Sequence, residues 1–177
     1  MTAMNTTANK ITVFRMIMIP VFLVLLYLGL RFWALAVYII ACLSDVADGY
    51  IARHYNQVTN FGKFMDPLAD KMLVCSALIC LVQLQQLPAW VVIIVVSRDF
   101  IISGFRLVAS DRGVVIAASM WGKAKTCSQM FTIGLLILNV PVLHVFTEVC
   151  VVIMVCLTVV SLVDYLVKNK EVLAERS

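Results

Sequence analysis

Four aspartates interrupt two apolar stretches of the chain, and their types and spacing are suited to chemistry. Asp45 and Asp48 are three residues apart. Asp66 and Asp70 are four residues apart. On helices, each pair shares one face, and the short connection predicts antiparallel packing that brings the two acidic faces together. Four carboxylates around one cavity suit hard divalent cations such as magnesium or manganese, and no cysteine or histidine completes a zinc site.

Small residues and one arginine stand at fixed positions among these aspartates. The full pattern is Asp45-x2-Asp48-Gly49-x2-Ala52-Arg53-x8-Gly62-x3-Asp66-x3-Asp70. The small residues allow a bulky group to approach the backbone closely, although tight packing between helices is an alternative reason for them. Arg53 carries a planar fork of donors that suits phosphate oxygens, and its alternative role is a cytoplasmic anchor.

The elements that carry this pattern have the composition of a membrane protein. Hydrophobic residues make up 63% of the 177 residues, and charged residues make up 14%. Soluble domains average about half apolar and about a quarter charged. The net charge of +4 is modest, and no basic run is interleaved with aromatics, so we expect no nucleic-acid partner.

Apolar runs predict an all-α, polytopic membrane protein. A spanning helix needs about 20 mostly apolar residues. Residues 1–177 are expected to form a single membrane domain, with a polar segment at 1–10, a charged tail at 168–177 and a mixed stretch at 110–122. The first apolar run is expected to be a retained helix and not a signal peptide. Six spans are predicted near residues 11–30, 33–53, 62–85, 88–109, 123–140 and 143–167.

Basic residues predict the orientation of these spans. Cytoplasmic loops are enriched in Lys and Arg. Arg31 is the only basic residue in one set of alternate loops. Both termini are therefore expected in the cytoplasm, together with the ends of the helices that carry the aspartates. The opposite set of connections and ends holds Lys10, Arg15, Arg53, Lys63, Lys71, Arg106, Arg112, Lys123, Lys125, Lys168, Lys170 and Arg176.

The acidic pattern resembles the signature of the CDP-alcohol phosphotransferases, with all eight fixed positions present. The resemblance implies an alcohol that attacks the phosphate of a CDP-linked donor and displaces CMP. It implies a six-helix homodimer with a polar cavity open to the cytoplasm and two metal ions. By position, Asp45, Asp48, Asp66 and Asp70 would hold the metals, and Asp70 would also be the general base. The CDP part would contact Gly49, Ala52, Arg53 and Gly62.

Two further regions resemble bacterial phosphatidylglycerophosphate synthases. The first is Asn9-x2-Thr12-x2-Arg15, in which Asn9 would support the nucleotide, or would cap the helix instead. The second is the run GVVIAASMWGKAKT, residues 113–126. Those enzymes more often carry Arg-Glu where this chain has Arg98-Asp99.

Arg98 is predicted about halfway along a membrane helix, where a charge needs an anionic partner. Asp99 is adjacent in sequence and is not expected to share the helix face of Arg98. An acidic acceptor such as glycerol 3-phosphate is a suitable partner, and Arg106 lies about two turns nearer the cytoplasm. Lys123 and Lys125 are expected to close this pocket, with anchoring at the cytoplasmic interface as the alternative.

The sequence therefore predicts a bacterial plasma-membrane transferase of phospholipid biosynthesis. It would make phosphatidylglycerophosphate and CMP from CDP-diacylglycerol and glycerol 3-phosphate. One alternative keeps the chemistry but uses inositol phosphate or phosphatidylglycerol as the acceptor. A remote alternative is a divalent-cation transporter, which would not need Gly49, Ala52 and Arg53 at fixed spacing.

The orientation can be measured with reporter fusions. Fusions at Arg31, Gln86 and Pro141 are expected to report the outside of the membrane. Fusions at Asn56, Arg112 and Ser177 are expected to report the cytoplasm. An outside signal at Asn56 would contradict the topology, because it would place the aspartates on the wrong face.

Overall fold

A computed structural model describes residues 7–54, 60–111 and 119–169, except for the side chains at 7–10, 12, 45–54, 60–68, 70 and 110–111. Within the described ranges the chain forms six α-helices, one short 3-10 helix (Pro141–Leu143) and no strand. The predicted all-α class is confirmed, and the six helices lie near the six predicted spans; that all six cross a membrane stays a prediction. Their bounds are α1 (Thr7–Tyr27), α2 (Arg31–His54), α3 (Asn60–Gln83), α4 (Ala89–Asp111), α5 (Met120–Leu138) and α6 (His144–Lys168).

The helices end at the breaks that the sequence predicts. Gly29 follows α1 with a φ of 75°. Its N–H donates to the Leu26 carbonyl at 3.1 Å, and the Leu30 N–H donates to the Leu25 carbonyl at 3.0 Å. This pair of bonds is a Schellman motif, in which a left-handed residue satisfies the last carbonyls of a helix. Asn139 ends α5 in the same left-handed region and is followed by Pro141.

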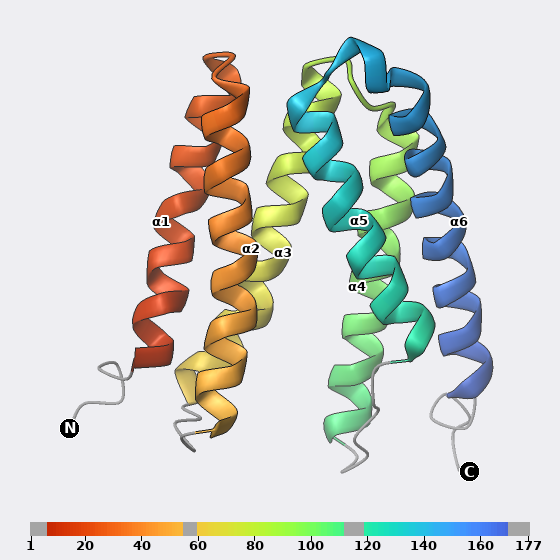
Figure 1. Cartoon of the computed structure of the whole chain (residues 1–177). Helices are drawn as coiled ribbons and strands as arrows, with labels where there is room; N and C mark the ends of the chain where they lie inside the picture. The colour runs from red at the N-terminus through yellow and green to blue at the C-terminus, as the bar shows by residue number, and fades with distance from the viewer. Residues whose placement is uncertain (1–6, 55–59, 112–118, 170–177) are drawn as a thin grey trace. The chain divides into compact units, whose positions relative to one another are not determined.

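The chain divides into two compact units, Met1–Gln85 and Gln86–Ser177, and each is described by itself. In the first unit, α1 lies side by side with α2 and also contacts α3 (Figure 1). Ala34 and Ala41 on α2 are buried, and such small residues let helices approach closely. The rings of Phe22 and Tyr38 join α1 to α2 with centroids 5.8 Å apart. This packing positions the helices that carry the acidic motif.

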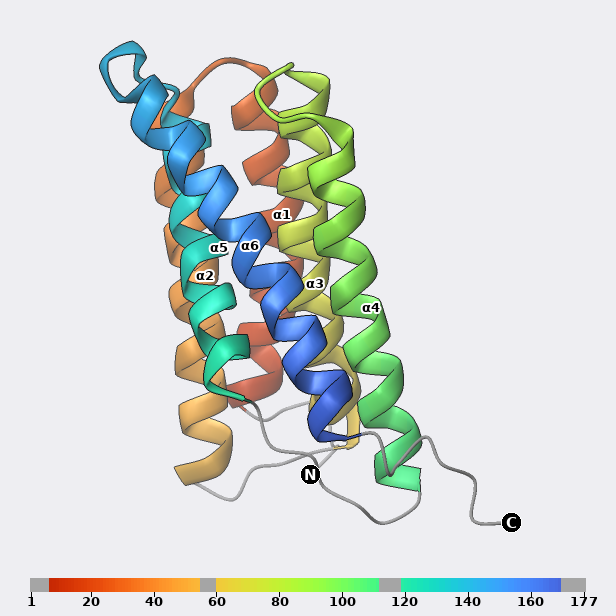
Figure 2. The same ribbon diagram turned by 90° about the vertical axis from the view of Figure 1, so that its right-hand side faces the viewer.

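In the second unit, α6 packs against both α4 and α5. Figure 2 shows α6 in front of these two helices, running between them. The buried residues of the unit include Ile133 and Ile137 on α5 and Met154 on α6. Nearer the end of α6, the rings of Phe105 and Tyr165 meet edge to face at 6.1 Å.

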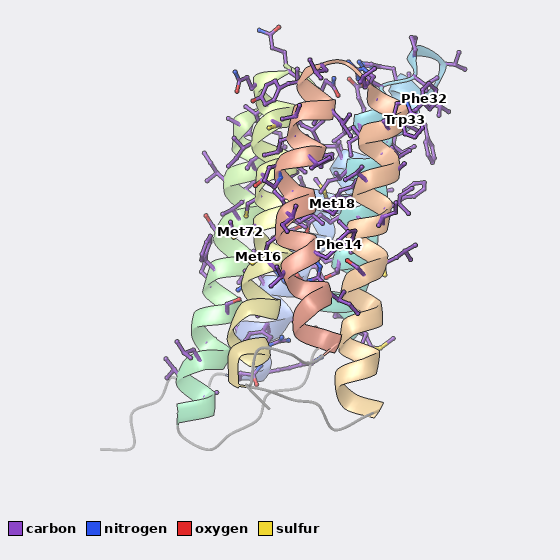
Figure 3. The ribbon with its side chains drawn as sticks, turned by 90° about the vertical axis from the view of Figure 1, so that its left-hand side faces the viewer. Phe14, Met16, Met18, Phe32, Trp33 and Met72 are labelled. Atoms are coloured by element: carbon purple, nitrogen blue, oxygen red, sulfur yellow. The ribbon has the colours of Figure 1, made fainter. Side chains whose placement is uncertain are left out.

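Large apolar side chains cover much of the outer surface of each unit. Phe32 and Trp33 at the start of α2 are 79% and 68% exposed (Figure 3). Figure 3 also shows Phe14 on α1 and Met72 on α3, both exposed. Among the described residues, one helical stretch, Pro141–Lys168, is long and apolar enough to cross a membrane. Shorter apolar helical stretches are Val13–Tyr27, Arg31–Ser44 and Lys71–Gln83.

Comparison of Gly29 with Gly104 tests whether the left-handed backbone after α1 needs a glycine, because neither position lacks space for a side chain. An added Cβ would meet nothing within 4 Å at either Gly29 or Gly104, but only Gly29 has a positive φ. Gly29→Ala is therefore expected to destabilise the fold by about 1–2 kcal/mol, the cost of a left-handed L-residue. Gly104→Ala, inside α4, is expected to be neutral or to stabilise by up to about 1 kcal/mol.

The measurement is unfolding of both variants in the same detergent. Equal stability of Gly29→Ala and Gly104→Ala would contradict the role assigned to the left-handed turn.

Candidate functional site

The acidic motif lies entirely in the first unit, on the end of α2 and the first half of α3. Figure 1 shows these two helices running antiparallel, as the sequence predicts. Both aspartate pairs stand on helices, so the spacing of three and four residues places each pair on one helical face. The backbone therefore places one aspartate pair on a face of α2 and the other pair on a face of α3.

Ligand roles for these residues stay predictions, because their side chains lie outside the described part of the structure. The same holds for Asn9, although α1 begins at Thr7, so Asn9 lies within the first turn and not at the helix cap. Among the described side chains, no group of three or more histidines, cysteines, aspartates or glutamates could hold a metal. The metal-binding set therefore rests on Asp45, Asp48, Asp66 and Asp70, and the CDP-binding set on Asn9, Gly49, Ala52, Arg53 and Gly62.

Arg15 brings a buried positive charge to the start of the acidic motif. Its side chain on α1 is completely buried. Its Nε donates to the hydroxyl of Ser44 on α2 at 3.4 Å, and Ser44 donates to the Ala41 carbonyl at 2.7 Å. Ser44 immediately precedes Asp45 in the chain. A buried guanidinium requires polar or anionic partners, and the Ser44 hydroxyl is one of them.

In the second unit, three charged residues form what we call the Asp99 bridge: Arg98, Asp99 and Lys125. The Lys125 ammonium lies 2.7 and 2.8 Å from the two carboxylate oxygens of Asp99. Arg98 Nη1 lies 3.0 Å from Asp99 Oδ1. The expectation that Asp99 cannot share a face with Arg98 is wrong, because the long arginine side chain reaches around the helix to its neighbour. The bridge joins α4 to α5 and has a net charge of +1.

Lys125 is only 2% exposed, so it does not anchor the chain at an interface. Burial of a lysine is favourable only when its charge is paired, and Asp99 supplies that charge. Lys123, two residues earlier, is exposed. Arg106 is also exposed, and its guanidinium carbon lies 5.9 Å from the centre of the Tyr165 ring, a cation–π contact. Of the four residues predicted for the acceptor, the structure brings Arg98 and Lys125 together.

Ser161 is a further polar member of this cluster that the sequence analysis did not single out. It is completely buried on α6, and its hydroxyl accepts a hydrogen bond from Arg98 Nε at 3.0 Å. The same face of α6 carries Thr158 and Tyr165, also buried. Hydroxyl residues spaced by three and four positions in an otherwise apolar helix are the sequence signal that could have indicated this buried polar face.

Comparison with known proteins gives a family and relatives. The family model described as CDP-alcohol phosphatidyltransferase matches residues 5–165. That interval contains the acidic motif, the Asp99 bridge and Ser161.

Two bacterial relatives cover most of the chain. A protein of Bacillus subtilis named CDP-diacylglycerol–glycerol-3-phosphate 3-phosphatidyltransferase is 43% identical over 184 residues, covering 93% of this chain and 95% of the relative. A Haemophilus influenzae protein of the same name is 37% identical over 168 residues, covering 88% of this chain and 89% of the relative.

The Asp99 bridge predicts unequal effects of two charge-removing changes. Asp99→Asn leaves a buried ammonium without its counter-charge and is expected to cost about 3 kcal/mol of stability. The double variant Asp99→Asn/Lys125→Met leaves no buried lysine charge and should be more stable than Asp99→Asn alone. The measurement is denaturant or thermal unfolding in detergent.

A second ion pair in the same unit provides the control. Lys168 Nζ also lies 2.7 Å from a carboxylate oxygen, that of Asp164, but Lys168 is 61% exposed. Lys168→Met is expected to cost less than Asp99→Asn, because the Lys168 ammonium is largely exposed to solvent, although its partner Asp164 is only 15% exposed. If Asp99→Asn were no more costly than Lys168→Met, burial of the bridge would not matter to stability.

Proposed function

The chain belongs to the CDP-alcohol phosphatidyltransferase family, and from this premise we propose that it transfers the phosphatidyl group of CDP-diacylglycerol to glycerol 3-phosphate. The family resemblance predicted from the acidic motif is confirmed, and the chain is a transferase. The choice of acceptor rests on two relatives that have the same name, CDP-diacylglycerol–glycerol-3-phosphate 3-phosphatidyltransferase, and that each align with this chain over most of both lengths. The products are phosphatidylglycerophosphate and CMP.

The donor set of the motif fits two divalent cations, magnesium or manganese. Asp45, Asp48, Asp66 and Asp70 supply only hard oxygen ligands, from two antiparallel helices joined by a short connection. When bound, such ions neutralise the diphosphate of the donor and stabilise the CMP leaving group. Arg15, buried beside Ser44, adds a fixed positive charge at the start of the same motif.

The remaining motif residues have roles in this proposal that follow from their chemistry. Asp70 accepts the proton of the attacking hydroxyl as it approaches the phosphorus. Arg53 donates to phosphate oxygens of the CDP part, and Asn9 supports the nucleotide. Gly49, Ala52 and Gly62 leave the helix surfaces open to it.

The acceptor phosphate is assigned to the basic residues of the second unit. Arg98 is the centre of this site, with Lys125 beside it in the Asp99 bridge. Arg106 and Lys123 are exposed and, in this proposal, supply further positive charge for the acceptor. The Asp99 bridge has a net positive charge, which suits a phosphate monoester. The arginine can also donate two parallel hydrogen bonds to the phosphate oxygens.

The apolar outer surfaces support insertion in a bilayer. In the proposal all six helices span the bacterial plasma membrane, with both termini and the motif on the cytoplasmic side, and two copies form a homodimer as the family resemblance implies. The helical stretch Pro141–Lys168 is the strongest structural support, because its length and composition suit a span. Exposed aromatic side chains at the start of α2 suit a membrane–water interface.

Release of CMP tests the activity directly. Purified protein in detergent with CDP-diacylglycerol and glycerol 3-phosphate is expected to release CMP. EDTA should abolish the reaction, and magnesium or manganese should restore it. Parallel reactions replace the acceptor by inositol phosphate or phosphatidylglycerol. Turnover with one of these and none with glycerol 3-phosphate would reject the acceptor, and full turnover in EDTA would reject the metals.

The base is tested by Asp70→Asn, measured alongside the wild type in the same assay. The amide keeps the size of the side chain but cannot take a proton, so turnover should fall by about 100- to 10,000-fold. Glu148→Gln makes the same chemical change at an exposed position of α6 and should leave turnover unchanged. Equal activity of the two variants would show that another group accepts the proton.

A further inference from the structure

Arg98 is held at two of its three guanidinium nitrogens. Nε donates to the Ser161 hydroxyl on α6, and Nη1 donates to the Asp99 carboxylate, both at 3.0 Å. Two contacts on different nitrogens fix the plane of the group as well as its position. The third nitrogen, Nη2, has no hydrogen-bond partner among the described residues and lies 3.4 Å from where a Cβ at Gly122 would stand, beside the first turn of α5.

Both partners of Arg98 are themselves held in place. The Ser161 hydroxyl donates its proton to the Thr158 carbonyl at 3.0 Å, so its oxygen can only accept from Arg98. The Asp99 carboxylate receives the Lys125 ammonium on both oxygens. Ser161 is completely buried, so water does not replace its contact with the guanidinium. The arrangement is a clamp with one part on α4 and one on α6.

We propose that Ser161 and Asp99 are positioning residues that orient Arg98 so that Nη2 and the second N–H of Nη1 are presented to the phosphate of the acceptor. The inference rests on the proposed function, in which Arg98 binds that phosphate. It makes α6, otherwise an apolar helix, part of the acceptor site.

The clamp predicts an effect on one substrate only. A guanidinium that is already oriented loses less freedom when it binds a phosphate, so the clamp strengthens binding of the acceptor. The residues assigned to CDP lie in the other unit of the chain, whereas the hydrogen bonds described for Ser161 and Asp99 are made to residues of their own unit. Loss of the clamp should therefore raise the KM for glycerol 3-phosphate and leave the KM for CDP-diacylglycerol unchanged.

Ser161→Ala is the most direct test, because it removes one hydroxyl and no charge. Loss of a direct charged hydrogen bond typically weakens binding by about ten- to a hundredfold. Ser161 acts through Arg98, so a smaller rise of about three- to tenfold in the KM for glycerol 3-phosphate is expected. The kcat at saturating acceptor and the KM for the donor should stay within about twofold of wild type.

Thr158→Val is the matched control. Thr158 is also completely buried on α6, one turn before Ser161, and its hydroxyl donates to the Met154 carbonyl at 2.7 Å without contacting Arg98. Valine keeps its shape and removes the hydroxyl. Thr158→Val should match wild type in both KM values, in samples matched for folded protein by thermal unfolding.

An Arg98→Lys background separates positioning from a general packing effect. Lysine has no Nε donor for Ser161, so adding Ser161→Ala to Arg98→Lys should change the acceptor KM by less than about twofold. A full three- to tenfold rise in that background would overturn the clamp. So would a Ser161→Ala variant that matches Thr158→Val, or one that raises both KM values alike.

Failure of this inference is distinguishable from failure of the proposed function. If wild-type protein releases no CMP with glycerol 3-phosphate, the proposed function is rejected and the inference with it. If wild-type protein is active and Ser161→Ala has the same acceptor KM, the clamp alone is rejected.

Discussion

Lys125 carries its ammonium to a position that is almost completely buried, and the carboxylate of Asp99 compensates it there. Compensation of buried charge is the constraint on which the second unit depends, because an isolated ion in an apolar interior is far too costly to keep. Asp99 also holds Arg98, and Arg98 in turn holds Ser161. One carboxylate therefore links α4 to α5 and, through the guanidinium, to α6.

The first unit meets the same constraint with a different residue. Arg15 is fully buried between α1 and α2 and donates to Ser44, next to the first aspartate of the motif. In the proposed function, the positive charge of Arg15 offsets the negative charge of the motif aspartates. In the proposed reaction, Arg15 is the structural counter-charge in the first unit, which binds the donor and the metals. Asp99 is the structural counter-charge in the second unit, which binds the acceptor.

In the proposed arrangement, helix α6 belongs both to the membrane-spanning part of the protein and to the acceptor site. Its outward positions carry valines such as Val152 and Val163, which are exposed. Its inward face carries Thr158 and Ser161, which are buried with their hydroxyl protons donated to backbone carbonyls. These hydrogen bonds to carbonyls of the same helix satisfy the hydroxyl groups without any charge, so the helix stays apolar enough to cross a membrane. The oxygen of Ser161 can still accept a hydrogen bond from Arg98.

By itself the sequence determined the family, the helical class, the breaks between helices and the spacing of the aspartates. These follow from local patterns, because apolar run length, turn residues and motif spacing are properties of neighbouring positions. Only the tertiary structure decided that Arg98 bonds to Asp99, that Lys125 is buried and Lys123 exposed, and that Ser161 belongs to the cluster. Those outcomes depend on which helices pack together and how far long side chains reach, and residues 63 positions apart leave no local pattern of their contact.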